Sequence, residues 1–174
     1  MKKVIYRYFM DYQREEQWLN EQSKKGFQLV KVQFSRYTFV EGSPGEYIYR
    51  NELLSGLESN GNKEYLEFLQ EGGIEVVDQF VGWVYFRKKT AEGPFELYSD
   101  TSSKISYLNR IIYIFGSILL VNLYFFFFNF IIVDGINRWL SYLSLTAVII
   151  MAFPVYTVYK RKKKLRAAQQ IFHQ

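Results

Sequence analysis

The sequence has no cysteine and a single histidine, and both shortages argue against metal binding and nucleophilic catalysis. With 0 Cys among 174 residues, the chain has no disulfide, no thiolate metal ligand and no cysteine nucleophile. The sequence offers His173 neither a partner ligand nor an orienting carboxylate. The motifs Gly-x-Ser-x-Gly and Gly-Lys-Ser/Thr are also absent. We therefore expect no metal site, no cofactor and no enzymatic activity.

Acidic residues are almost absent from the C-terminal part of the chain. Residues 104–174 hold 9 Lys and Arg against 1 acidic residue, a net charge of +8, whereas residues 1–103 hold 13 against 16, a net charge of −3. Phosphate binding needs a basic face, so the N-terminal part is not expected to bind nucleic acid. The basic excess of the whole chain, +5, therefore belongs to its C-terminal part.

Two segments of the C-terminal part contain no charge at all. Ile111–Val133 has 23 such residues and Trp139–Tyr159 has 21. As helices they measure about 30–35 Å, which matches the hydrocarbon thickness of a bilayer. The connection, residues 134–138, is long enough only for a tight turn. The sequence thus predicts two transmembrane helices in an antiparallel hairpin, with residues 160–174 as a basic tail.

The basic residues next to the two spans indicate their orientation. They gather on one side, whereas the turn holds only Arg138, so the bias of cations toward the cytoplasm predicts a two-span plasma-membrane protein with both termini inside. The cations after the second span also serve as an anchor on the anionic surface of the lipid bilayer. These cations are Lys160, Arg161, Lys162, Lys163, Lys164 and Arg166.

Two amides interrupt the first predicted span. Asn122 and Asn129 are seven residues apart and share one helix face. An amide in lipid needs a hydrogen-bonding partner, and we expect contact with the hydroxyl groups of the second span rather than a solute pathway. The candidate partners are Ser141, Ser144, Thr146 and Thr157.

Residues 1–90 repeat one pattern of strand, helix, strand and strand. Ile5-Tyr6-Arg7 recurs as Ile48-Tyr49-Arg50, and from the helices onward the copies match at an offset of 47, as in Gly26 and Gly73. The predicted strands are 4–9, 27–34, 36–40, 46–51, 74–80 and 83–88, with helices after Asp11 and from Asn62. Residues 91–110 are expected as a linker that becomes helical. We predict an α+β fold with antiparallel sheet and two helices.

Two arrangements of this pattern remain open. Paired strand–helix–strand–strand units are similar to the GyrI-like effector-binding domains, which bind amphipathic ligands between their halves. The alternative is a ferredoxin-like βαββαβ sandwich with an extra strand. In either arrangement, Glu15 and Glu16 are expected to be solvated residues in the first turns of a helix.

An aromatic set alternates along the predicted strands, and its rings are expected on one sheet face. Such rings form either a packed core or a recognition groove, because Tyr and Trp combine apolar area with a polar tip and can hold cations. Glu46 and Glu52 offer a counter-charge for a cation, and Arg50 offers one for an acidic partner. The aromatic residues are Tyr37, Phe39, Tyr47, Tyr49, Trp83 and Tyr85.

The N-terminal part resembles the bacterial domain-of-unknown-function family numbered 2812 over about its first 105 residues. The resemblance rests on Arg7-Tyr8-Phe9, Glu15-Glu16-Gln17-Trp18-Leu19-Asn20-Glu21, Lys25-Gly26-Phe27, Arg36-Tyr37-Thr38-Phe39, Pro44-Gly45-Glu46-Tyr47 and Gly82-Trp83-Val84-Tyr85-Phe86-Arg87-Lys88. It implies membrane spans after the domain and genes placed beside PadR-type regulators. No enzymatic activity is established for that family, so the resemblance supports the domain and its location more than a mechanism.

Two functions follow as hypotheses. The first is a non-enzymatic, membrane-anchored sensor whose cytoplasmic domain binds a small amphipathic ligand or a regulatory partner protein. The second is an accessory or immunity-type protein that acts on another membrane protein through the Asn122 and Asn129 face of its hairpin.

Overall fold

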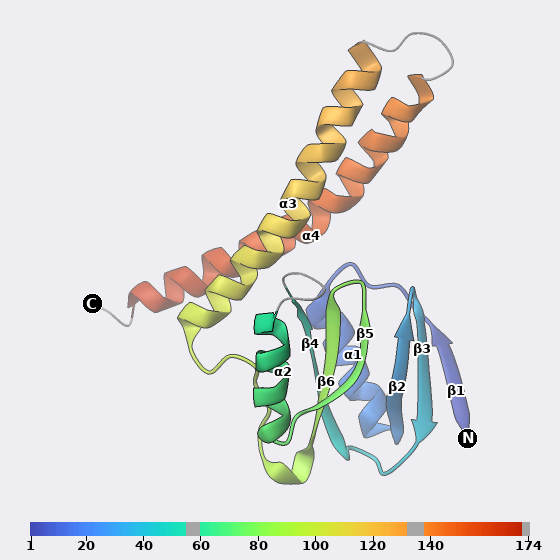
Figure 1. Cartoon of the computed structure of the whole chain (residues 1–174), viewed down its shortest axis with the longest axis vertical. Helices are drawn as coiled ribbons and strands as arrows, with labels where there is room; N and C mark the ends of the chain where they lie inside the picture. The colour runs from blue at the N-terminus through green and yellow to red at the C-terminus, as the bar shows by residue number, and fades with distance from the viewer. Residues whose placement is uncertain (55–59, 132–137, 172–174) are drawn as a thin grey trace. The chain divides into compact units, whose positions relative to one another are not determined.

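The computed structural model describes residues 1–54, 60–131 and 138–171. The chain divides into two compact units, Met1–Leu97 and Tyr98–Gln174, and each is treated by itself. The first unit is α+β and the second is a hairpin of two long helices, as the sequence predicts (Figure 1).

The first repeat contains three strands and one helix. Strand β1 (Lys2–Tyr6) leads to helix α1 (Tyr12–Lys24) and then to strands β2 (Phe27–Gln33) and β3 (Arg36–Glu41). The strands form an antiparallel sheet in the order β1-β3-β2. Strand β1 ends earlier than predicted because its partner β3 starts only at Arg36.

The second repeat has the same connectivity. Strand β4 (Tyr47–Leu53) is followed by helix α2 (Asn60–Glu71) and by strands β5 (Glu75–Phe80) and β6 (Trp83–Lys89). These strands pair antiparallel in the order β4-β6-β5. A short 3₁₀ turn, η1 (Thr90–Glu92), follows, and the unit continues to Leu97, beyond the expected boundary at residue 90.

The repeat extends to the details of the backbone. The ladders are irregular at Val30 and at Val77, which are 47 residues apart. Gly26 and Gly73 both adopt positive φ after their helices, at 82° and 78°, where a side chain would be strained. The same offset thus relates sequence, topology and local geometry.

Helix α1 begins and ends where its capping residues stand. Asp11 is the N-cap, and its Oδ1 accepts a hydrogen bond from the Gln13 backbone N–H at 3.0 Å. At the other end the Gly26 N–H donates to the Ser23 carbonyl oxygen at 2.9 Å. These contacts fix the position of α1 in the chain and hence the residues that it presents to the strands.

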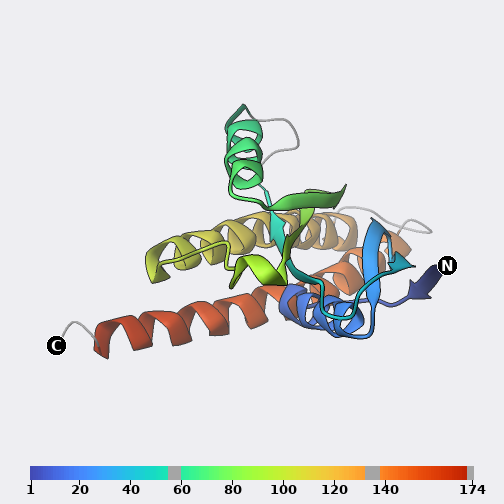
Figure 2. The ribbon, with the colours of Figure 1, turned by 90° about the horizontal axis from the view of Figure 1, so that it is seen from below.

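The apolar core of the first unit has two parts, one for each helix. The larger lies along α1 and includes Trp18, Leu19, Leu29, Val32, Tyr37, Phe39, Tyr49 and Tyr85, from both repeats. The smaller lies along α2 and includes Leu54, Leu69, Val84, Phe86 and Phe95. Along β6, Trp83 and Tyr85 therefore contribute to the first part, and Val84 and Phe86 to the second. Figures 1 and 2 show α1 and α2 in separate places beside the strands.

The second unit consists of helices α3 (Thr101–Ile131) and α4 (Trp139–Ile171), which lie side by side as an antiparallel hairpin (Figure 1). Both are long and apolar enough to cross a membrane. The predicted turn falls on residues that lie outside the described ranges, apart from Arg138. Helix α3 starts ten residues before the predicted span, and α4 continues through the basic stretch with Pro154 inside it.

Candidate functional site

Helix α1 carries a carboxylate on its buried side. Glu15 shares the spacing i, i+3, i+4 with Trp18 and Leu19, and all three face the strands. Glu15 is only 8% exposed. The expectation of a solvated Glu15 is therefore wrong, because the residue belongs to the apolar stripe of its helix. That spacing was the signal in the sequence that could have identified it.

Three strands from both repeats supply hydrogen bonds to this carboxylate. The hydroxyl groups of Tyr37, on β3, and Tyr85, on β6, each donate to Glu15 Oε1 at 2.7 Å. The Asn51 amide, on β4, donates through Nδ2 to Oε2 at 3.4 Å. We call these four residues the Glu15 cluster. It is a polar contact between the two repeats inside the apolar core.

Burial determines the protonation of the Glu15 cluster. It raises the pKa of Glu15 above that of an ordinary glutamate, and the hydrogen bonds from the two tyrosines oppose this only in part. Burial, together with the neighbouring Glu15 carboxylate, also raises the pKa of Tyr37 and of Tyr85. Both tyrosines therefore remain neutral donors at physiological pH. Within the part of the chain that the structure describes, no cation pairs with the Glu15 carboxylate to offset its desolvation.

Asn51 leaves a second acceptor beside this carboxylate. Its Nδ2 group also donates to the Tyr12 carbonyl oxygen at 3.3 Å. Its Oδ1 atom is buried and has no hydrogen-bonding partner among the residues that the structure describes. Buried polar atoms are rarely left in this state, since each costs about 1–3 kcal/mol. The Glu15 cluster thus contains one buried acceptor, Asn51 Oδ1, that has no donor among the described residues.

Aromatic rings surround the Glu15 cluster. The Trp18 ring packs edge-on against Tyr37, with centroids 4.9 Å apart, and against Phe39 at 5.7 Å. The guanidinium of Arg7 lies over the Trp18 ring at 5.4 Å and over Phe9 at 5.0 Å. These rings already hold one cation of the chain by cation–π attraction.

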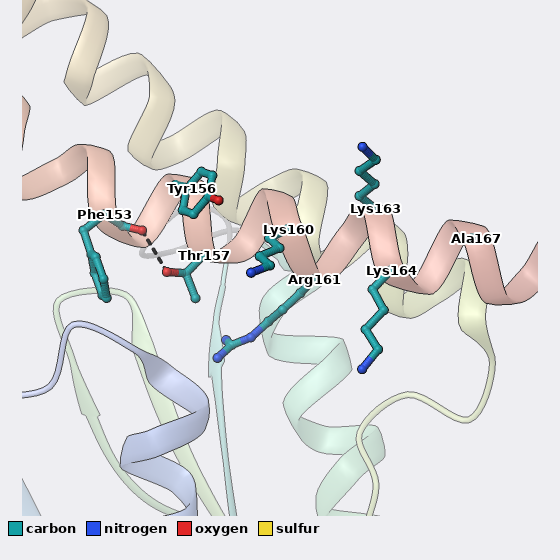
Figure 3. Close-up of a pocket in the computed structure, with 8 residues that line it drawn as sticks. All are labelled: Phe153, Tyr156, Thr157, Lys160, Arg161, Lys163, Lys164 and Ala167. Carbon is teal, nitrogen blue, oxygen red and sulfur yellow. Dashed lines mark hydrogen bonds between the residues drawn. The ribbon is translucent and has the colours of Figure 1, made fainter.

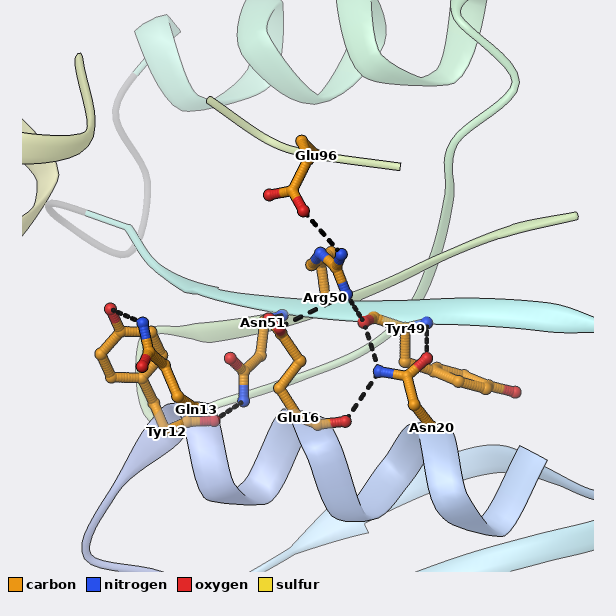
Figure 4. A network of polar contacts seen from close by, with 8 residues as sticks. All are labelled: Tyr12, Gln13, Glu16, Asn20, Tyr49, Arg50, Asn51 and Glu96. Atoms are coloured by element: carbon orange, nitrogen blue, oxygen red, sulfur yellow. Dashed lines mark hydrogen bonds and ion pairs between the residues drawn. The ribbon is translucent and has the colours of Figure 1, made fainter. Parts of the chain in front are cut away.

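Side chains of α1 also cover the free edge of strand β4 (Figure 4). Asn20 donates to the Tyr49 carbonyl oxygen and accepts from the Tyr49 N–H, each at 2.9 Å. Ser23 donates to the Tyr47 carbonyl oxygen at 2.7 Å, and Glu16 accepts from the Asn51 N–H at 3.4 Å. The side chains therefore replace a neighbouring strand along this edge.

Arg50 belongs to this edge rather than to an open surface. Its guanidinium pairs with Glu16 at 3.4 Å and with Glu96 at 2.9 Å, and it lies 5.9 Å from the Phe95 ring centroid. Figure 4 shows Arg50 between Glu96 and α1. The Arg50 charge is thus compensated within the first unit.

Glu46, the first expected counter-charge, is half-buried, and its backbone carbonyl oxygen accepts from the Thr90 N–H at 2.9 Å.

The structure brings together most of the predicted aromatic face. Four of its six residues are at most 4% exposed, so a solute cannot reach them in this conformation. The other two, Tyr47 and Trp83, are half-buried and pack against the same core. Glu52, the second expected counter-charge, is buried on the other side of β4 and accepts from the Tyr65 hydroxyl at 2.8 Å. The four buried rings are Tyr37, Phe39, Tyr49 and Tyr85.

The two amides of α3 bond to their own helix. Asn122 Nδ2 donates to the Ile118 carbonyl oxygen at 2.9 Å, and Asn129 Nδ2 donates to that of Phe125 at 2.7 Å. Among the described residues neither forms the predicted hydrogen bond to α4. A carbonyl four residues earlier is always within reach of a helical asparagine, and that local contact is the one formed here.

The basic stretch continues α4 without a break. A hollow along the helix is lined by Phe153, Tyr156, Thr157, Lys160, Arg161, Lys163, Lys164 and Ala167 (Figure 3). In that view Arg161 and Lys164 point to one side and Lys163 to the other. Lys162 and Arg166 lie in the same helical segment. Cations therefore extend to more than one side of the helix, directly after its apolar part.

Two α+β repeats followed by a hairpin of two long apolar helices define the class of this protein. The chain belongs to the family described as "Protein of unknown function (DUF2812)", which matches residues 11–120. The match begins at the N-cap of α1, includes the whole Glu15 cluster and ends within α3. No curated protein and no solved structure matches the chain.

Proposed function

We propose that this protein is a non-enzymatic, membrane-anchored sensor that binds an amphipathic organic cation between its two cytoplasmic repeats. The observation that carries the proposal is the Glu15 cluster. A buried carboxylate beside an amide oxygen that has no partner in the described ranges favours a ligand that brings positive charge and N–H or C–H donors. The surrounding rings suit an apolar cation, as Arg7 on Trp18 illustrates.

Binding requires the repeats to separate, because the rings of the cluster are buried. The Glu15 carboxylate then exchanges its two tyrosine hydroxyl donors for the cation. The hydroxyl groups are released together, one from each repeat, so the ligand changes the contact between the repeats. This change is the signal that the sensor passes to a regulatory partner protein. The ligand favours the open state only by the difference in its affinity for the two states.

A titration of the full-length protein in lipid nanodiscs tests the proposal. Tetraphenylphosphonium is the probe, and tetraphenylborate, an anion of the same shape, is its control. We expect saturable quenching of tryptophan fluorescence by the cation alone, because Trp18 lines the cluster. Glu15→Gln keeps the shape and an acceptor for the tyrosines but removes the charge, and it should weaken binding at least tenfold.

Glu21→Gln is the matched control, since Glu21 is exposed on the same helix and lies outside the cluster. Its affinity should equal that of the wild type. A signal that does not saturate, or that is equal in the Glu15→Gln protein, would mean that the probe only partitions into lipid. Either result would reject the proposal.

A second candidate is an accessory or immunity-type protein that acts on another membrane protein through α3. The observation in its favour is that the Asn122 and Asn129 amides leave their Oδ1 acceptors without a partner on α4 among the described residues. Asn122→Leu with Asn129→Leu should then abolish one specific cross-link to a membrane protein in intact cells. Thr146→Leu in α4 is the control, and an unchanged cross-link in the double variant would reject this function.

A further inference from the structure

The corresponding edge strands of the two repeats differ in the side chains that cover them. Strands β1 and β4 occupy the same position in the orders β1-β3-β2 and β4-β6-β5. The β4 edge is covered by Glu16, Asn20 and Ser23 of α1. At the offset of 47, the matching residues of α2 are Lys63, Glu67 and Gln70. Lys63 and Glu67 instead pair with each other at 3.9 Å, on an exposed surface.

Strand β1 therefore has an open edge. The Met1 carbonyl oxygen accepts from the Glu41 N–H, and the Arg7 N–H donates to the Ser35 carbonyl oxygen, so the odd-numbered residues of β1 bond to β3. The backbone groups of Lys2, Val4 and Tyr6 then point away from the sheet. Among the described residues, none bonds to them.

The other edge strand of the first sheet, β2, has outward backbone hydrogen bonds. The Leu29 N–H of β2 donates to the Tyr49 hydroxyl at 3.0 Å, and the Val32 N–H donates to Asp78 Oδ2, on β5, at 2.6 Å. An open edge strand is a template for another strand, and proteins normally cover it. The side chains of Val4 and Tyr6 are 41% and 74% exposed. The open edge is thus also apolar.

The sequence of β1 fits a second copy of itself. A two-fold axis at Val4 places Val4 opposite the second copy's Val4, Lys2 opposite Tyr6, and Lys3 opposite Ile5. The even-numbered residues, whose backbone groups are open, then form the hydrogen-bonded pairs. Each Lys2 ammonium meets the Tyr6 ring of the other copy, which is a favourable cross-strand pair.

Charge disfavours the two neighbouring registers. Sliding one strand by two residues places Lys3 opposite Lys3 in one direction and Lys3 opposite Arg7 in the other. Like charges directly opposite each other destabilise strand pairing. The lysines therefore disfavour both neighbouring registers and oppose indiscriminate pairing of this edge.

We infer that the protein forms a homodimer through antiparallel pairing of β1 with β1 of a second copy, with Val4 opposite Val4. The result is one six-stranded sheet in the order β2-β3-β1-β1-β3-β2. Two open edges close in a single contact, with two-fold symmetry. The inference does not depend on the proposed function, because β1 contributes no residue to the Glu15 cluster.

Disulfide cross-linking tests the register directly, because the chain has 0 Cys. In a hydrogen-bonded antiparallel pair the Cα atoms are about 5.5 Å apart, within the range of a disulfide. Full-length Val4→Cys protein in nanodiscs loaded with two copies should form a reducible dimer at least tenfold faster than Tyr6→Cys protein. Two Tyr6 residues lie about 14 Å apart in this register, at about 3.4 Å per residue.

A mixture provides the second test. Lys2→Cys protein combined with Tyr6→Cys protein should cross-link quickly to each other, whereas each alone should not. Equal rates at positions 2, 4 and 6 would indicate random collision and would overturn the inference. So would fast cross-linking of Tyr6→Cys alone, which requires another register.

Val4→Pro tests the pairing without a cross-linker. Proline removes the outward N–H of Val4, which has no partner within the described chain, so the first unit should still fold. We expect light scattering of the detergent-solubilised full-length protein to give a dimer for the wild type and a monomer for the variant. The inference would also be overturned if light scattering gave a monomer for the wild type and the Val4→Cys protein cross-linked only slowly at the same concentration.

Discussion

The side-chain amide of Asn20 hydrogen-bonds both backbone groups of Tyr49, which lies 29 residues away on an edge strand. The Nδ2 group donates to the carbonyl oxygen and Oδ1 accepts from the N–H, each at 2.9 Å. The asparagine thus takes the place of a neighbouring strand. Because Tyr49 is 1% exposed and its hydroxyl contacts Leu29, this contact also fixes how the two repeats meet.

Asn20→Ala should destabilise the first unit by about 1–3 kcal/mol, because two backbone groups of Tyr49 lose their partner in a part-buried place. Gln17→Ala, at an exposed position of the same helix, should change stability by less than about 0.5 kcal/mol. Urea unfolding of the full-length protein in detergent, followed by tryptophan fluorescence, measures both. Equal midpoints for the two variants would contradict the role given to Asn20.

The raised pKa of Glu15 should make stability fall as pH increases. A folded-state pKa above the unfolded one means that the folded protein holds more protons between the two values, so the stabilising contribution is complete below the unfolded pKa. It is lost as pH rises through the folded pKa. Glu15→Gln removes this titration and should gain stability relative to the wild type toward neutral pH.

Thermal unfolding midpoints of the wild type and of Glu15→Gln, measured from pH 4 to 8, test this expectation. The difference between the two proteins should change with pH and then level off. Glu21→Gln should follow the wild type throughout. A constant difference between wild type and Glu15→Gln would show that Glu15 titrates normally.

Val81 should be replaceable with a gain in stability. It stands at the tip of the β5–β6 hairpin with φ of 48° and is 74% exposed, and the left-handed conformation is unfavourable for a β-branched residue. Val81→Asn creates Asn-Gly with Gly82, the preferred pair for such a turn, and should stabilise by about 1–2 kcal/mol. Phe34→Asn, at the matching position of the first repeat, should give no such gain, because φ is not positive there.

The orientation in the membrane remains a prediction of the sequence. In cells, Gly135→Cys protein should react with a membrane-impermeant maleimide added from outside. Gln169→Cys protein should react only after the membrane is permeabilised, because the basic stretch holds the tail in the cytoplasm. Labelling in the reverse order would show that both termini lie outside.

The strand–helix–strand–strand repeat and the two long apolar helices could be predicted because their signals are local. Alternating or helical periodicity, the Asp11 cap and Gly26 each act within a few residues, and hydrophobic length alone indicates a possible span. The candidate site could be predicted only in part. Tyr37 and Tyr85 both donate to Glu15, but the rings that were expected on one sheet face belong to two sheets, and Glu15 itself was expected in solvent.

The sequence by itself determined the elements, their order and the duplication, because each depends on neighbours along the chain. Only the tertiary structure decided which residues meet between the repeats. Glu15 and Tyr85 are 70 residues apart in the sequence, and the Tyr85 hydroxyl donates a hydrogen bond to the buried Glu15 carboxylate. Tertiary packing also made the repeats unequal: α1 covers the β4 edge, whereas none of the described residues bonds to the outer edge of β1, although both strands have the same place in their repeats. Contacts between distant segments depend on which helix packs against which edge, and local periodicity carries no information about that choice.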